Sequence, residues 1–165
     1  MEKKVQEKRS DRPENLVAVV FSNAEDVDSD PMVTEIASSV CSYLNLAGSC
    51  NNVLRMSIAN SSYPDVRQAM SSAHILILSG VVDALTVDDL MRSKTLGEDG
   101  AIKKVIVVNE TLPGDLWKDL LCRGVDFVIP HPFEEENFHQ LLQLTVSGLM
   151  IQRRILKVMN QIPLA

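Results

Sequence analysis

The chain has 165 residues and a mass of 18.3 kDa, with 45% hydrophobic and 23% charged residues, a composition typical of one globular domain. It carries 16 lysines and arginines against 22 aspartates and glutamates, which gives a formal net charge of −6. An acidic chain lacks the positive field that holds a phosphate backbone or an anionic lipid surface. We therefore expect neither nucleic acid nor a membrane as its partner.

The first 14 residues alternate charges and contain almost no apolar side chains, which predicts a flexible charged arm over residues 1–14. This start lacks the continuous apolar stretch of a secretory signal, and no apolar run in the chain is long enough to span a bilayer. Cys41, Cys50 and Cys122 have no metal-binding spacing. We therefore expect reduced thiols and a cytoplasmic location.

The first predicted elements are a buried strand and an amphipathic helix. Residues 16–21 form a continuous apolar run, typical of a strand that is covered on both faces. After a polar loop, Asp30 provides a helix cap and Pro31 suits the first helical turn. Gly48 is expected to end this helix. Its apolar residues recur every three to four positions, at Val33, Ile36, Val40 and Leu44.

The same alternation continues to the end of the chain. The remaining strands are expected at residues 53–56, 75–78, 105–108 and 127–129. The remaining helices are expected at residues 64–72, 86–95 and 115–123, with a long last helix after Phe133. Five strands that alternate with five helices predict a doubly wound α/β fold with a parallel sheet. The expected fold is the flavodoxin-like (βα)5 fold, with strand order 2-1-3-4-5 and an extended C-terminal helix.

Ligands of such folds bind beyond the carboxyl ends of the strands. The loop after the first strand contains no glycine and carries four carboxylates that would repel a phosphate, so we expect no nucleotide or flavin cofactor. Asp26, Asp28 and Asp30 offer ligands for a divalent cation, with Ser79 and Asn109 as their facing partners, and a metal site within Asp26–Asp30 stays open.

Nucleophilic catalysis at this edge would use Ser79 and His131, with Asp83 nearby. No G-x-S-x-G nucleophile elbow is present, and the other histidines do not form a metal pair. We therefore expect no enzyme activity and assign no catalytic, cofactor-binding or metal residue.

Residues 124–133, which read GVDFVIPHPF, resemble the last-strand signature of response-regulator receiver domains, G-A-D-D-Y-L-x-K-P-F. Residues 74–79, 105–110 and 16–21 are similar to the third, fourth and first strands of these domains. The resemblance covers about residues 16–147 in the correct order. It implies a CheY-like fold and a role in two-component signalling.

The resemblance also implies a phospho-acceptor pocket, and the chain departs from the family pattern at each of its positions. Ser79 stands in place of the acceptor aspartate, and Phe21 and Ser22 stand in place of the acidic pair that holds Mg²⁺. Asn109 replaces the switch hydroxyl, and His131 replaces the phosphate-binding lysine. The resemblance thus implies a degenerate pseudo-receiver that does not depend on phosphorylation. The alternatives are a flavodoxin-like small-ligand domain and an atypical receiver that is phosphorylated on another acid such as Asp83.

The last helix is longer than a receiver requires. A receiver helix would end near Gly148, but a heptad-like apolar pattern continues through Leu141, Leu144, Gly148, Ile151, Ile155, Val158 and Ile162. We expect a receiver-like domain over residues 15–147 and a helical extension over residues 148–165. The extension would form a homodimer, dock a partner domain or pack back onto its own domain. The expected interface residues are Leu149, Ile151, Ile155, Leu156, Val158, Met159 and Ile162.

The sequence therefore predicts a phosphorylation-independent, receiver-like regulatory module of a signalling or transcription-control protein. We expect it to act through contacts with protein, by the face that helix 4, strand 5 and helix 5 form in receivers and by the extended last helix.

Overall fold

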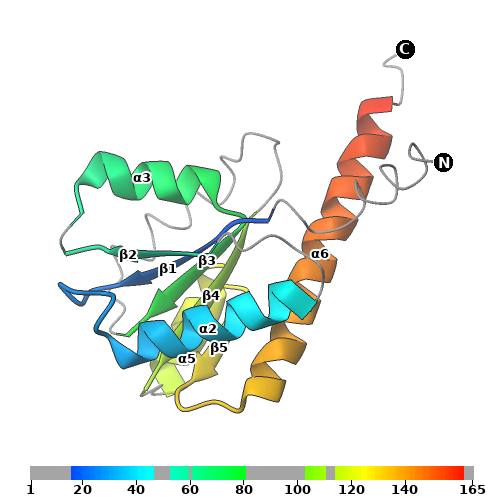
Figure 1. The fold of residues 1–165 in the computed structure, drawn as a ribbon. Helices are drawn as coiled ribbons and strands as arrows, with labels where there is room; N and C mark the ends of the chain where they lie inside the picture. The colour runs from blue at the N-terminus through cyan, green and yellow to red at the C-terminus, as the bar shows by residue number, and fades with distance from the viewer. Residues whose placement is uncertain (1–15, 47–52, 60, 81–102, 111–113, 162–165) are drawn as a thin grey trace.

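The structure is a computed structural model that describes residues 16–46, 53–59, 61–80, 103–110 and 114–161. Its centre is one parallel sheet of five strands in the order β2-β1-β3-β4-β5 (Figure 1). The predicted fold class and strand order are both confirmed. The strands are β1 (Ala18–Ser22), β2 (Val53–Ser57), β3 (Ile75–Ser79), β4 (Lys104–Asn109) and β5 (Phe127–Pro130).

Four helices of the described part connect and cover these strands: α2 (Pro31–Leu46), α3 (Tyr63–Ser72), α5 (Gly114–Cys122) and α6 (Glu135–Gln161). Their bounds lie close to those expected from the apolar periodicity. The helix expected at residues 86–95 and the expected helix end at Gly48 lie outside the described residues. No helix in the described ranges is both long enough and apolar enough to cross a membrane.

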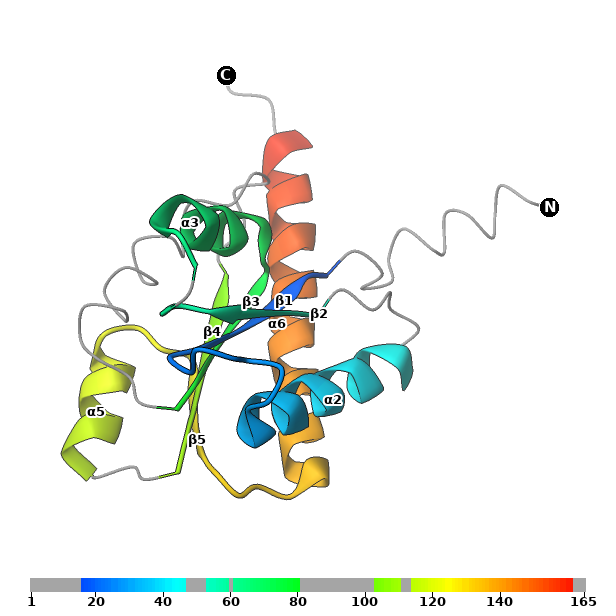
Figure 2. The same ribbon diagram turned by 60° about the vertical axis from the view of Figure 1, so that its left-hand side comes forward.

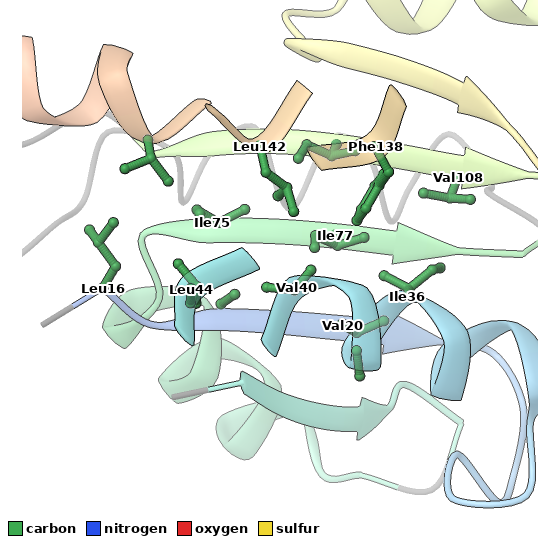
Figure 3. Close-up of a cluster of buried hydrophobic side chains, with 14 of the residues drawn as sticks. Leu16, Val20, Ile36, Val40, Leu44, Ile75, Ile77, Val108, Phe138 and Leu142 are labelled. Carbon is green, nitrogen blue, oxygen red and sulfur yellow. The ribbon is translucent and has the colours of Figure 1, made fainter. Parts of the chain in front are cut away.

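The sheet is buried on both faces because alternate strand residues enter two separate hydrophobic clusters. On β1, Val20 packs in the first cluster beneath α2 and α6, whereas Val19 and Phe21 pack in the second cluster beneath α3 and α5. Figure 3 shows the first cluster, in which Phe138 and Leu142 of α6 face the central strands. The continuous apolar runs in the sequence follow from this double burial, since both faces of a strand need apolar side chains.

Local signals explain where two of the helices begin and end. Asp30 Oδ1 accepts a hydrogen bond from the backbone N–H of Met32 at 3.0 Å, so the predicted cap of α2 is confirmed. After α5, Gly124 has a φ of 102°, a conformation that favours glycine, and its N–H donates to the carbonyl of Leu121 at 3.1 Å. Gly124 therefore closes α5, next to the helix end that the sequence predicts at residue 123.

The last helix has one part that packs against the sheet and one part that projects beyond it. Its inner side contributes Phe138, Leu142, Val146 and Leu149 to the first cluster, and all four are buried. Beyond Met150 the helix continues to Gln161 past the ends of the strands (Figures 1 and 2). The extended C-terminal helix that the apolar pattern predicts is therefore present.

Candidate functional site

Three serines lie in register across the carboxyl ends of neighbouring strands. Ser22, the last residue of β1, is the register partner of Ser57 on β2 and of Ser79 on β3. All three are at least nine-tenths buried. Because side chains alternate along a strand, Ser22 and Ser79 belong to the same face of the sheet as Val20 and Ile77, the face covered by α2 and α6. We refer to Ser57, Ser22 and Ser79 as the serine row.

Two members of the serine row hold the loop that joins β1 to α2. The hydroxyl of Ser22 accepts from the N–H of Ala24 at 3.1 Å and donates to Asp30 Oδ2 at 3.2 Å. The hydroxyl of Ser57 donates to the carbonyl of Ala24 at 2.6 Å. The loop is therefore fastened to the sheet edge by its own backbone and by the carboxylate that also caps α2. Sequence analysis did not identify Ser57, although it too is a polar residue at the carboxyl end of a strand.

Ser79 differs from its two neighbours in the serine row. Its hydroxyl oxygen is buried and has no hydrogen-bond partner among the described residues. In particular, the ring of His131 does not accept from this hydroxyl, so the two residues that nucleophilic catalysis at this edge would use are not hydrogen-bonded to each other. Asp83, the third candidate for that mechanism, lies outside the described residues.

The ring of His131 instead contacts a carboxylate on another element. Its Nε2 lies 2.7 Å from Glu35 Oε2 on α2, and its backbone N–H donates to the carbonyl of Asn109 at 2.9 Å. The ring also meets the edge of Phe133, with 5.7 Å between ring centroids, and the His131–Pro132 peptide bond is cis. No local sequence pattern indicates Glu35 as this partner, because the two residues are 96 positions apart.

The other positions of the expected pocket do not converge on Ser79. Phe21 is fully buried in the second hydrophobic cluster, so its side chain lies within the core rather than at the strand edge. The side-chain oxygen of Asn109 accepts from the N–H of Glu110 at 2.9 Å. The structure therefore brings Ser22 and Ser79 together, while Phe21, Asn109 and His131 each interact elsewhere.

Two carboxylates of the acidic loop, those of Asp26 and Asp30, accept hydrogen bonds within the protein. Asp26 Oδ1 accepts from the N–H of Asp28 at 3.1 Å, and both oxygens of Asp30 accept hydrogen bonds from Met32 and Ser22. Within the described ranges, no three histidine, cysteine, aspartate or glutamate side chains come together as metal ligands. The arrangement at this edge thus fixes a loop and the start of a helix.

Five large apolar side chains of α6 are exposed on the side of the helix that faces away from the sheet. Leu144, Ile151, Ile155, Val158 and Met159 are 52–64% exposed, and their spacing places them on one side of the helix. We call these five residues the outer stripe.

One residue of the expected interface, Leu149, is buried and does not belong to the outer stripe. Leu149 is 2% exposed and belongs to the first hydrophobic cluster, because it lies on the inner side of the helix and not with the outer stripe. Leu156 is partly buried, and Ile162 lies outside the described residues. Ile151, Ile155, Val158 and Met159 remain as exposed residues of the expected interface.

No protein-family model and no curated protein matches this sequence. Among solved structures, the chain is similar to the signal receiver domain of a Luxo repressor protein from Vibrio parahaemolyticus, with 14% identity, a TM-score of 0.58, and coverage of 85% of this chain and 97% of that chain. It is similar to a response regulator from Desulfuromonas acetoxidans, with 16% identity, a TM-score of 0.55, and coverage of 81% and 98%. A protein ascribed to pilus assembly in Burkholderia thailandensis gives 16% identity, a TM-score of 0.55, and coverage of 80% and 98%.

The similarity covers 98% and 97% of the two receiver-type structures, so it extends over nearly the whole of each. At such low sequence identity the similarity concerns the fold. The chain has the fold of response-regulator receiver domains.

Proposed function

We propose that the chain is a phosphorylation-independent, receiver-like regulatory module of a signalling or transcription-control protein, and that it acts by binding protein. The observation that carries this proposal is Ser79 at the carboxyl end of β3, with a buried hydroxyl that has no partner in the described part of the chain. Transfer of a phosphoryl group depends on charge neutralisation, usually by a divalent cation. The adjacent Ser22 is engaged by Asp30 and supplies no acidic ligand for such a cation.

The outer stripe supports a second copy of the chain as the protein partner. Exposed apolar side chains at heptad-like spacing are typical of helices that pair. Burial of one leucine or isoleucine side chain is worth about 1.5–3 kcal/mol, so a few such residues per chain offset the cost of association. Two apolar residues of α5, Trp117 and Leu121, are also exposed. The helix α5 takes the place in chain order of helix 4 of the expected docking face.

The remaining parts of the proposal concern location and partners. Similarity to receiver domains supports a regulatory role without a catalytic step of its own. The net charge of −6 argues against direct binding of nucleic acid or of an anionic membrane. Cys41 and Cys122 are free thiols, which supports a cytoplasmic location.

Substitution within the outer stripe tests the proposed self-association. We expect Ile155→Asp combined with Val158→Asp to convert a dimer into a monomer, because the contact between the two outer stripes would then bury carboxylates without partners. Both side chains are exposed within the chain, so the thermal melt of the variant should remain cooperative. The matched control is Lys118→Gln with Lys157→Gln, which makes the same change in net charge at exposed positions outside the outer stripe and should leave the dimer intact. A wild-type chain that is monomeric at high concentration would refute the homodimer.

A further inference from the structure

Two adjoining cavities lie between α2 and the first turns of α6, two helices that pack on the same face of the sheet and cross near the start of α6 (Figure 2). The smaller cavity has a volume of about 180 Å³ and is lined by Glu35, Ser38, Ser39, Phe133 and Glu135. The larger cavity, of about 680 Å³, shares Glu135 and continues along the same helices past Tyr43 and His139. A water molecule occupies about 30 Å³ in the liquid, so the smaller cavity has room for a functional group of several atoms.

The charge around the smaller cavity is negative. Glu35 on α2 and Glu135 on α6 approach it from two helices, and the lining residues of both cavities include no lysine or arginine among the described residues. Glu35 uses Oε2 in its contact with His131, and Glu135 Oε1 lies 3.5 Å from Nε2 of His139. The second oxygen of each carboxylate remains as an acceptor for a donor group that enters from outside.

A buried hydroxyl provides an independent indication of a ligand. Ser39 is only 4% exposed and lines the smaller cavity, but its hydroxyl oxygen has no hydrogen-bond partner among the described residues. Its carbonyl, in contrast, accepts from His139 Nε2 at 3.1 Å. A buried hydroxyl without a partner is unfavourable, and the structure does not explain this one by contacts within the described part of the protein. A donor in the cavity that reaches this oxygen would satisfy it.

The aromatic wall of the cavity favours a flat cation. Phe133 is stacked on Phe138, with 4.6 Å between ring centroids, which supports the ring from within the core. A guanidinium group has five N–H donors in one plane, bonds readily to carboxylates and packs well on aromatic rings. It therefore suits a cavity that combines two carboxylates, a hydroxyl and a phenyl ring.

We propose that the cavity between Glu35 and Glu135 binds the guanidinium group of an arginine side chain that a partner polypeptide presents. The larger cavity extends this site along α2 and α6 and accommodates the backbone that carries the arginine. This site is separate from the outer stripe, so the two surfaces bind independently.

The test is a titration of the full ¹⁵N-labelled chain with acetyl-Gly-Arg-Gly-amide, followed by amide NMR. The matched probe has citrulline in place of arginine, which keeps the shape of the side chain and removes its charge. We expect saturable shifts at Ser38, Ser39 and Glu135 with the arginine peptide and none with the citrulline peptide. Glu35→Gln with Glu135→Gln should weaken binding at least tenfold, because both carboxylates are lost. Ser39→Ala should weaken it several-fold without loss of thermal stability.

The control variant is Asp115→Asn, which removes an exposed carboxylate from α5 on the opposite side of the sheet and should not change the affinity. Equal binding of the two peptides would overturn the proposal, as would unchanged affinity in the Glu35→Gln, Glu135→Gln variant. Absence of saturable shifts at the cavity would overturn it as well. None of these outcomes depends on the oligomeric state, so the experiments test the arginine site and the proposed dimer separately.

Discussion

Ser22 and Ser79 are register partners on adjacent parallel strands, and both are buried, yet only the hydroxyl of Ser22 makes hydrogen bonds within the described part of the chain. Ser22 connects β1 to Asp30 and Ala24, and so holds the loop that leads into α2. Ser79 occupies the equivalent place on β3 without a partner. The same side chain therefore has a structural role on one strand and none on the next.

This difference predicts opposite effects of the same substitution. Ser22→Ala should lower the free energy of unfolding by about 1–2 kcal/mol, because it removes two hydrogen bonds and leaves part of Asp30 without its donor. Ser79→Ala should leave the stability unchanged or raise it, because a buried hydroxyl without a partner is replaced by a methyl group. Urea unfolding of both variants measures the difference, and equal destabilisation by the two substitutions would contradict the assignment.

Restoring the acceptor aspartate should not by itself restore phosphorylation. We expect Ser79→Asp, incubated with acetyl phosphate and Mg²⁺, to show no phosphoryl adduct of about 80 Da in its intact mass, because no acidic pair holds the cation at the end of β1. The Ser79→Ala variant, treated identically, serves as the control. A stoichiometric, acid-labile adduct on Ser79→Asp alone would show that other carboxylates supply the metal site.

Lys103 should stabilise the fold because its ammonium group binds backbone carbonyls at the end of α3. Its side chain is 4% exposed, and its ammonium group donates to the carbonyls of Ser71, at 2.7 Å, and of Ala73. Lys103→Met should therefore lower the free energy of unfolding by about 2 kcal/mol, since hydrogen bonds to a charged group are stronger than neutral ones. Lys118→Met, at an exposed position of α5, should have little effect. Chemical denaturation of both variants distinguishes the two sites.

Tyr43 should lose its hydroxyl proton at a higher pH than an ordinary tyrosine. Burial raises the pKa of its hydroxyl above 10.0, because the phenolate form loses solvation. The unfolded chain releases this proton near pH 10, so the contribution of Tyr43 to stability is complete below that pH and falls as the pH rises further. A difference absorbance titration of the wild type against Tyr43→Phe measures this pKa. A midpoint at or below 10.0 would mean that the ring is not desolvated.

The sequence was sufficient to predict the sheet, because short continuous apolar runs such as residues 75–78 are typical of strands covered on both faces and alternate with helical patterns along the chain. The cap at Asp30 and the helix end at Gly124 were also predictable, since each depends on one residue and its neighbours. Contacts between distant elements were not predictable from the sequence. The pairing of His131 with Glu35 depends on how α2 packs beside β5, which no local pattern indicates.

Leu149 illustrates the same limit on a helix. Its spacing from Leu142 and Val146 places the three residues on one side of α6, but only the packing of the helix on the sheet shows that this side is the buried one. The structure places Leu149 inside with Leu142 and Val146, and leaves Ile155 and Val158 outside.

Sedimentation equilibrium of the wild-type chain, with and without acetyl phosphate and Mg²⁺, tests the proposed function most directly. The chain mass is 18.3 kDa, and we expect twice this mass under both conditions, because the outer stripe pairs two copies and the carboxyl edge of β3 takes no phosphoryl group. A monomer that becomes a dimer only when the phosphate donor is added would contradict the account.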